Sequence, residues 1–224
     1  MKKAIIFVLF CLAVPLLLGA SPTPTLKELK TIQLPAPQTD GGQPLMQVLK
    51  NRHSSRAFAK ETLPLQGLSN LLWAADGVNR PDKGGRTAPS AMNWQEIEIY
   101  VAMAEGLYLY EAKTHTLKQI IAEDLRGKTG RQGFVDEAPV NLIYVADYSR
   151  IGLLSSAVTS AEDKVFYTAC DTGVIAQNVY LFCTSEGLAT VVRGLIDRTG
   201  LAKAMKLRSN QKIMLAQTVG YPKK

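Results

Sequence analysis

The sequence predicts an α+β fold in which helices pack on a β-sheet to form a sandwich. A near-continuous apolar run over residues 140–146 indicates a buried central strand. Apolar residues recur every three to four positions between residues 163 and 186, which indicates a long helix. Strand and helix patterns are interspersed along the chain, and 224 residues are enough for one domain with a full core. These observations favour a single mixed α+β domain.

The first residues have the pattern of a secretory signal peptide. Two lysines precede an apolar run over residues 4–18, and the small residues Gly19 and Ala20 follow it. We therefore predict cleavage after Ala20 and export of residues 21–224 to the periplasm or the extracellular space. The alternative is a short membrane anchor, but the run is shorter than the ~20 residues that a spanning helix needs. No stable membrane insertion is expected after cleavage.

An arm and two helices are predicted next. Residues 21–43 are rich in Pro, Thr, Gln and Gly, which is typical of an extended arm or linker before the domain at residues 44–224. A helix is expected to begin near Pro44, because apolar residues follow it at helical spacing. A second helix is expected after Pro64, a residue favoured in a first turn, and Gly77 is placed to end it.

The elements after residue 77 are predicted from the alternation of apolar and polar residues, the length of apolar segments and the positions of turn residues. Two apolar segments bracket a polar turn at residues 111–115, which predicts a hairpin. Gly187 is placed to end the long helix. In chain order the sequence predicts a loop over 78–90, a strand over 97–102, a hairpin over 106–117, a polar stretch with helical tendency over 118–133, the central strand over 140–146, a helix over 163–186 and a strand over 212–220.

Charge and cysteine content exclude some classes of protein. The formal net charge is +7, but the basic residues are scattered and no basic run is interleaved with aromatic residues, so no nucleic-acid partner is expected. Of three cysteines, Cys11 lies in the predicted signal peptide. Cys170 and Cys183 are thirteen positions apart on one predicted helix, which separates them by roughly 20 Å and excludes a disulfide. We interpret both as small core residues.

Few side chains suit acid–base or metal chemistry. The chain contains two histidines, His53 and His115, so no metal site with several histidines is expected. His115 lies in the polar hairpin turn and is predicted to be solvated. There is no phosphate-binding P-loop, no Gly-x-Gly-x-x-Gly and no Gly-x-Ser-x-Gly. If the chain is an enzyme, it is expected to take its chemistry from a cofactor.

The densest cluster of hydrogen-bond donors is Arg52-His53-Ser54-Ser55-Arg56, which follows the first predicted helix. Two guanidinium groups, a hydroxyl and turn amides suit a phosphate or another anion. By composition alone, a solvated basic helix end is the more common interpretation of such a cluster.

Four segments resemble signatures of the FMN-dependent nitroreductase family. They are Arg-His-Ser-Ser-Arg-Ala-Phe at 52–58, Pro-Ser-Ala-Met-Asn-Trp-Gln at 89–95, the helix and its exit at 171–191, and Val-Gly-Tyr-Pro at 219–222. The segments occur in the family's order, and the resemblance covers about residues 44–222. It implies a three-layer α/β/α sandwich with a mixed, mainly antiparallel sheet, and a homodimer that holds flavin mononucleotide (FMN) between its subunits.

The resemblance also implies roles for individual residues around the flavin. Arg52 and Ser54 would hold the phosphate, with His53 adding backbone or ring contacts. Arg56 would lie beside the pyrimidine edge, where a cation stabilises the negative charge of reduced flavin. No side chain is expected to act as a covalent catalyst.

Further contacts are implied for the second signature and the segment after the long helix. Asn93, with Ser90 across the dimer interface, would hydrogen-bond the isoalloxazine or ribityl groups. The backbone amides of Arg193 and Gly194 would face flavin N5 and O4. Many relatives carry an acidic residue at the position of Arg193, so this arginine is predicted to change the charge of the substrate pocket. The long helix would form much of the dimer interface, with Ala169, Gly173 and Ala176 as its small-residue stripe.

The predicted function is FMN-dependent two-electron transfer in a ping-pong cycle to a small nitroaromatic, quinone or similar acceptor. The electron donor is NAD(P)H or another small molecule, and it stays open because the predicted export removes the protein from cytoplasmic NAD(P)H. Three alternatives also stay open. Residues 71–75 and 106–110 resemble the branch of azoline-type dehydrogenases that act on peptides. The second alternative is a flavin-binding protein without turnover, and the third is an anion- or peptide-binding protein without flavin.

Overall fold

The structure is a computed structural model that describes residues 29–223. The predicted signal peptide at residues 1–20 and the first part of the predicted arm lie outside this range, so the export prediction stays a prediction. Over residues 29–223, the helices are too short or too polar to cross a membrane.

A seven-stranded sheet forms the centre of the described part of the chain. Its strand order is β1-β6-β5-β4-β7-β9-β8, and each neighbouring pair is antiparallel. The predicted α+β class with a mainly antiparallel sheet is confirmed. The strands are β1 (Thr31–Gln33), β4 (Ile97–Met103), β5 (Gly106–Glu111), β6 (Thr116–Ile121), β7 (Val140–Asp147), β8 (Ala189–Arg193) and β9 (Gln211–Gly220).

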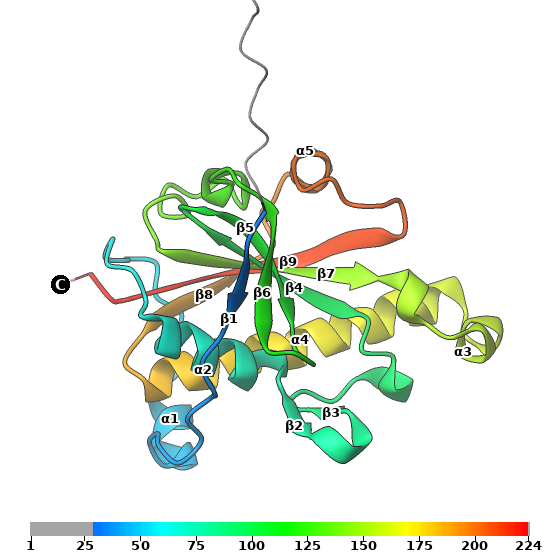
Figure 1. The fold of residues 1–224 in the computed structure, drawn as a ribbon, viewed down its shortest axis with the longest axis horizontal. Coiled ribbons are helices and arrows are strands. Elements are labelled where there is room, and N and C mark those ends of the chain that lie inside the picture. The colour runs from blue at the N-terminus through cyan, green and yellow to red at the C-terminus, as the bar shows by residue number, and fades with distance from the viewer. Residues whose placement is uncertain (1–28, 224) are drawn as a thin grey trace, which may run out of the picture.

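Helices cover both faces of this sheet, as Figure 1 shows. On one face lie α1 (Leu45–Asn51), α2 (Leu65–Asp76) and α4 (Ala161–Ser185), while α5 (Arg198–Ala204) covers the other. A further short helix, α3 (Leu153–Val158), projects at one end of the molecule. The three-layer α/β/α arrangement is therefore confirmed.

The central strands are buried on both faces, which explains the continuous apolar run in the sequence. Along β7, Leu142 and Tyr144 pack with α2 and α4, whereas the alternating residues Ile143 and Val145 pack with α5. All four are inaccessible to solvent. Because side chains alternate across a strand, both faces of β7 need apolar residues.

Local signals account for the ends of the two longer helices. The Gly77 N–H donates to the Trp73 carbonyl oxygen at 2.8 Å and ends α2 as predicted. At the start of α4 the Ser160 hydroxyl accepts from the Asp163 N–H at 3.0 Å, a side-chain cap. Gly187 follows the end of α4 with φ +69°, the left-handed conformation that glycine adopts without strain. The helix differs from its predicted bounds, 163–186, by only one or two residues.

The helical tendency predicted over residues 118–133 is wrong at its start. Strand β6 continues to Ile121, because Leu117, Gln119 and Ile121 point into the protein and the strand pairs with β5 on one side and β1 on the other. Only a short 3-10 turn, Arg126–Lys128, follows. The predicted arm likewise contributes β1, an edge strand of the sheet.

Several smaller elements were not predicted. The segment predicted as a loop over 78–90 forms a separate two-stranded sheet of β2 (Val78–Arg80) and β3 (Gly85–Arg86). The elements β8, α3 and α5 also have no counterpart among the sequence predictions.

The cysteines and small residues of α4 divide between its two sides. Cys183 is fully buried, as predicted, but Cys170 is exposed, so the core interpretation is wrong for Cys170. Ala176 packs inside the subunit, whereas Ala169 and Gly173 are exposed. A Cβ added at Gly173 would meet no atom within 4 Å, so nothing inside the subunit requires glycine there.

We predict that Gly106→Ala lowers the free energy of unfolding by roughly 2 kcal/mol. Gly106 begins β5 with φ +148°, and a Cβ there would collide with the carbonyl oxygen of Ile121. The matched control is Gly133→Ala, where an added Cβ meets no atom within 4 Å. Urea denaturation of both variants checks the prediction, and equal midpoints would contradict it.

Candidate functional site

The donor cluster at residues 52–56 lies on the surface beside α4 and β8. The Ser55 N–H donates to the Thr190 carbonyl oxygen at 2.9 Å, which anchors the segment next to β8. The guanidinium carbon of Arg52 lies 5.1 Å from the centre of the Tyr180 ring on α4, a cation–π contact. Such a contact uses the face of the guanidinium and leaves its N–H groups available to an anion.

Tyr180 also holds the hydroxyl of the cluster in place. Its hydroxyl oxygen lies 2.8 Å from Ser54 Oγ and accepts a hydrogen bond from the Val192 N–H at 2.9 Å. Ser54 is exposed although its partner is buried. The sequence placed Tyr180 only in the apolar stripe of the long helix. The missed signal was its hydroxyl, since a buried tyrosine usually has a hydrogen-bond partner.

His53 and Arg56 are both exposed. The His53 ring donates from Nδ1 to the Asn51 carbonyl oxygen at 2.8 Å, because a carbonyl oxygen can only accept. This bond orients the imidazole and leaves Nε2 free of that contact. The structure thus brings Arg52 and Ser54 together on Tyr180, and the same segment exposes His53 and Arg56.

Ser90 and Asn93 lie in a second, separate segment with an unusual backbone. Met92, Asn93 and Gln95 have φ values of 48°, 56° and 49°, so three non-glycine residues within four positions are left-handed. Such strain is concentrated at functional segments. The Gln95 side-chain amide donates to Asn93 Oδ1 at 3.0 Å, and Ser90 Oγ accepts from the Gln95 N–H at 2.8 Å. These bonds hold the strained segment in one conformation.

One subunit does not bring the two groups into contact. The Ala91 N–H donates to Asp171 Oδ2 on α4 at 2.8 Å, whereas the Ser54 cluster is attached to Tyr180 on the same helix. Tyr180 lies nine positions after Asp171, which is about 14 Å along the helix axis. The predicted contacts of Ser90 and Asn93 with the same ligand as Arg52 stay predictions.

The side chain of Arg193 does not reach a pocket. It is 4% exposed and donates to Thr218 Oγ1 at 2.9 Å, to the Thr129 carbonyl oxygen at 2.7 Å and to Asn141 Oδ1 at 2.8 Å. Burial lowers the pKa of Arg193 to about 10, which still leaves it protonated at neutral pH. The prediction that Arg193 changes the charge of the substrate pocket is therefore wrong for its side chain.

Gly194 follows Arg193 at the surface. Its carbonyl oxygen accepts from the Ile196 N–H at 3.0 Å and from Arg198 Nη1 at 3.2 Å. Those bonds engage the carbonyl only, so the Gly194 amide stays a predicted donor to a ligand. The Val192 N–H points away from β9, toward Tyr180, so the next amide along the strand, that of Arg193, points toward β9 and is not available to a ligand.

His115 is half-buried, so its predicted exposure is wrong. Ser69 Oγ donates to the Pro35 carbonyl oxygen at 2.6 Å and lies 2.7 Å from His115 Nε2, and the Tyr110 hydroxyl lies 3.0 Å from Nδ1. Since Ser69 gives its single proton to Pro35, it accepts from Nε2. Burial lowers the pKa of His115. Ser69 is inaccessible, so this Ser–His pair ties the arm and the hairpin to α2 and cannot meet a substrate.

Three buried carboxyl groups lie directly behind Ser90, and the sequence did not single them out. They are Asp76 at the end of α2, Glu96 before β4 and Asp171 on α4. Burial, with smaller contributions from Glu96 and Asp171, raises the pKa of Asp76 to about 7, although Arg86 and Arg150 lower it. Burial also raises the pKa of Glu96. Paired acidic residues with shifted pKa values are typical of functional sites.

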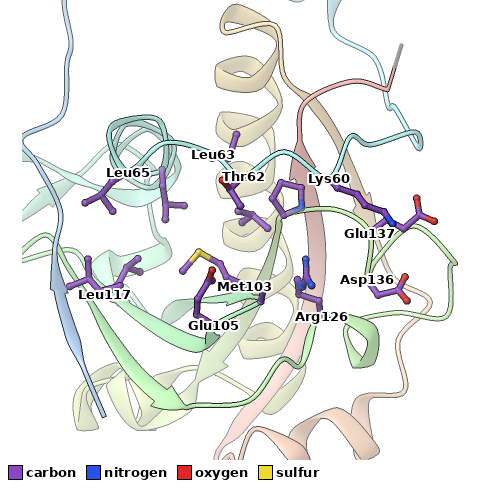
Figure 2. A pocket seen from close by; sticks show the side chains of 15 residues that line it. Lys60, Thr62, Leu63, Leu65, Met103, Glu105, Leu117, Arg126, Asp136 and Glu137 are labelled. Carbon is purple, nitrogen blue, oxygen red and sulfur yellow. The ribbon is translucent and has the colours of Figure 1, made fainter. Parts of the chain in front are cut away.

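The larger cavities lie away from the predicted site residues. The largest, about 730 Å³, opens at the sheet edge between β1, the start of α2 and the segment before β7 (Figure 2). Figure 2 shows Arg126, Lys60 and Glu137 at its charged side and Leu65, Met103 and Leu117 at its apolar side. A second cavity, about 550 Å³, lies between residues 38–48, α2 and α4. The hollow beside His53 and Ser55 measures only about 190 Å³.

Comparison with known proteins agrees with the fold and the order of the motifs. A family model described as the Nitroreductase family matches residues 49–221. A nitroreductase-like protein of Methanocaldococcus jannaschii is 33% identical over 175 residues, which cover 73% of this chain and 85% of that protein. The crystal structure of a nitroreductase-like protein from Ralstonia eutropha JMP134 is 42% identical with a TM-score of 0.81, over 87% of this chain and 90% of the other.

A more distant crystal structure contains the expected cofactor. It is that of a nitroreductase-like protein from Desulfovibrio desulfuricans in complex with FMN, which has a TM-score of 0.58 at 19% identity, over 81% of this chain and 88% of the other. At this identity the likeness concerns the fold. The family match and the similarity to the first two relatives show that the chain belongs to the nitroreductase family and is, in general terms, an oxidoreductase.

Proposed function

We propose that the protein is a homodimeric FMN-dependent oxidoreductase that passes two electrons from a small-molecule donor, NAD(P)H or another, to a nitroaromatic, quinone or similar acceptor. The observation that carries this proposal is the pair of donors formed by half-buried Arg52 and exposed Ser54, held on Tyr180 beside β8. The FMN complex of a protein with the same fold supports the choice of cofactor. The proposal includes export through residues 1–20.

The chemistry of the donor cluster fits a flavin phosphate. A guanidinium group offers a planar fork of N–H donors, which matches phosphate oxygens, and hydrogen bonds between ionised partners are stronger than neutral ones. When the Tyr180 hydroxyl donates to Ser54 Oγ, the Ser54 proton is free to be donated to a phosphate oxygen. Arg52 and Ser54 would hold this group, while His53 would line it.

When bound, FMN supplies hydride transfer at N5 in a ping-pong cycle, and the chain binds, orients and excludes water around it. Arg56 contributes an exposed positive charge at the site. A cation placed where negative charge develops is already oriented before reaction, so it stabilises that charge without reorganisation. Asn93 presents an exposed side-chain amide from its strained segment.

Two features support a second subunit as part of this site. A hollow of about 190 Å³ beside His53 is smaller than the roughly 300–1,000 Å³ of ligand pockets, so a partner surface is needed to enclose a flavin. Apolar side chains also gather on α3 and the first turns of α4, and a patch of this kind is rarely left uncovered. They are Leu153, Leu154, Val158, Val165 and Phe166, of which Leu154 is 87% and Phe166 62% exposed.

We predict that the purified protein binds FMN and then reduces a quinone or a nitroaromatic compound with a small-molecule donor. Flavin absorption retained after gel filtration and steady-state turnover would check the two parts separately. Flavin uptake without turnover over several donors and acceptors would favour a non-catalytic flavin-binding protein. A protein that takes up no FMN would contradict the proposal.

We predict that Arg52→Ala weakens FMN binding about 10–100-fold, because it removes charge-assisted hydrogen bonds to the phosphate worth about 1.5–3 kcal/mol. Ser54→Ala should weaken binding by a smaller factor. The matched control is Lys118→Ala, which removes an exposed positive charge on β6. Fluorescence titration of FMN measures all three, and equal affinities for Arg52→Ala and Lys118→Ala would rule out the assigned role.

We predict that Leu154→Asp combined with Phe166→Asp turns the dimer into a monomer, because two charges would have to be buried in the interface. Analytical ultracentrifugation measures the mass, and FMN affinity should fall with it. Leu29→Asp, a charge at another exposed apolar residue ahead of β1, serves as the control and should stay dimeric. A double variant that remains a dimer would place the interface elsewhere.

A further inference from the structure

A small cavity behind Ser90 collects carboxyl groups from three elements. Asp76, Glu96 and Asp171 line it together with Ser90. Its volume is about 10 Å³, which is room for about one water molecule. Among the described residues, no group of three His, Cys, Asp or Glu side chains is arranged to hold a metal ion.

Glu96 is the least satisfied of these groups. It is 0% exposed, its Oε2 accepts from Ser90 Oγ at 3.3 Å, and its Oε1 has no hydrogen-bond partner among the described residues. The fully buried Thr168 hydroxyl faces Glu96 outside standard hydrogen-bond geometry and lowers the pKa of Glu96. A buried polar atom without a partner costs about 1–3 kcal/mol, so a function is the simplest reason to retain it.

The surrounding cations neutralise this cluster only in part, because Arg86 forms an ion pair with Asp76 alone. Arg86 Nη1 lies 3.3 Å from Asp76 Oδ2, while Arg150 is bound to Glu98 at 2.8 Å. The charged and titratable side chains that face the cluster or the adjoining cavity, by element, are Asp76 on α2, Arg86 on β3, Glu96 before β4, Glu98 on β4, Tyr110 and Glu111 on β5, Lys113 in the hairpin turn, Arg150 after β7 and Asp171 on α4. Burial without full neutralisation favours the protonated carboxyl, in line with the raised pKa values of Asp76 and Glu96.

A polar cavity, different from the two large cavities described above, connects the carboxyl cluster with the outside. It measures about 210 Å³, its lining is mainly polar, and it includes Arg86, Lys113 and Arg150. Asp76 lines both this cavity and the small one behind Ser90. At the other end, the Ser90 hydroxyl joins Glu96 to the strained segment that presents Asn93. A continuous row of proton-exchanging groups therefore runs from the polar cavity to that segment.

We propose that Asp76 and Glu96 store a proton and deliver it through the Ser90 hydroxyl to the acceptor during its reduction, while water in the polar cavity refills Asp76. The storage site stands on the structure alone, and its use in catalysis rests on the proposed function.

The proton and electron balance of the step is complete. Reduction of a quinone-type acceptor to its dihydro form requires a hydride and one proton, and the hydride comes from the donor of the proposed function. When Glu96 is protonated, its hydrogen bond with Ser90 Oγ is reversed, and the carboxyl O–H bond of Glu96 breaks as Ser90 Oγ takes up that proton. Ser90 releases its own hydroxyl proton to the acceptor oxygen, and Asp76 reprotonates Glu96 through one water molecule, for which the small cavity has room. Water at the polar cavity then reprotonates Asp76.

The first measurement tests storage without flavin. Infrared difference spectra of the flavin-free protein, recorded from pH 5 to 9, should show a protonated carboxyl group that is lost with a midpoint near pH 7. Asp76→Asn should remove this titration, whereas Asp82→Asn, a control at an exposed aspartate, should retain it. Wild-type protein with no carboxyl group titrating within about one unit of pH 7 would overturn the proposal. Thermal unfolding verifies that each variant is folded.

The second measurement tests delivery in the FMN-loaded dimer. Glu96→Gln keeps the shape of the side chain but carries no transferable proton, so it should slow acceptor reduction about 100-fold, as expected for loss of a general acid. Reduction of the flavin by the donor should change less than about 2-fold, since that step needs no proton from this row. Because only the protonated carboxyl groups can deliver a proton, the rate of acceptor reduction by the wild-type protein should fall as pH rises through about 7. Asp76→Asn should abolish this fall.

The two measurements distinguish failure of the proton-storage site from failure of the proposed oxidoreductase function. Titration near pH 7 in a protein that binds no FMN would retain the storage site and overturn its catalytic use. Titration together with unchanged acceptor reduction in Glu96→Gln would overturn delivery. Loss of titration and of the pH dependence together in Asp76→Asn would support the complete inference.

Discussion

The packing of α4 against the central sheet is the constraint on which the rest of the site depends. Ile175, Val179 and Cys183 bury one side of this helix against the sheet, and its rotation is thereby set. Asp171 then points toward the strained segment and Tyr180 toward the donor cluster. One rigid helix therefore positions two groups of residues that lie on different loops. Loops alone would not hold such groups at a constant spacing, because they make few buried contacts.

Two buried charged groups show opposite solutions to the cost of desolvation. Arg193 directs its guanidinium at the oxygen atoms of Thr129, Asn141 and Thr218, all neutral groups, and this network joins β8, β7 and β9 to the preceding loop. Glu96 retains an unpartnered oxygen, and carboxyl groups surround it. A satisfied network rigidifies the sheet, whereas an unsatisfied carboxyl group holds a proton. Burial alone thus does not distinguish a charged group with a structural role from one with a role in catalysis. The hydrogen-bond partners of the group make that distinction.

The sequence could predict those parts of the fold that have a strong local pattern. The strand at 140–146 and the helix at 163–186 were found because one is apolar throughout and the other repeats at helical spacing. Strand β1 has only three residues, and its pairing with β6 decides its conformation. A three-residue segment carries no periodicity, so such a strand cannot be recognised before its neighbour is known.

Side-chain direction was the harder part of the site to predict. Arg193 points inward because of the register of β8 on β9, which pairs it with Ala216, and a shift by one residue would turn it outward. His115 is covered because the hairpin folds onto Ser69, 46 positions earlier in the chain. Asp76, Glu96 and Asp171 are likewise distant in sequence and meet only after α2, β4 and α4 pack. Local motifs contain none of this information.

The positions and contacts of the two histidines explain why a pair of carboxyl groups is the proposed proton source in this protein. Histidine is the residue whose ordinary pKa lies near neutrality, and most enzymes use it for proton transfer. Here His115 is engaged by Ser69 and Tyr110, with its pKa lowered. His53 lies in the donor cluster after α1, and that cluster is attached at Tyr180, nine positions along α4 from Asp171. Both are therefore unsuited to serve the segment at Ser90. Burial moves Asp76 into the same pH range from below. The packing of α2, β4 and α4 thus provides at Ser90 a proton donor that the composition of the chain does not reveal.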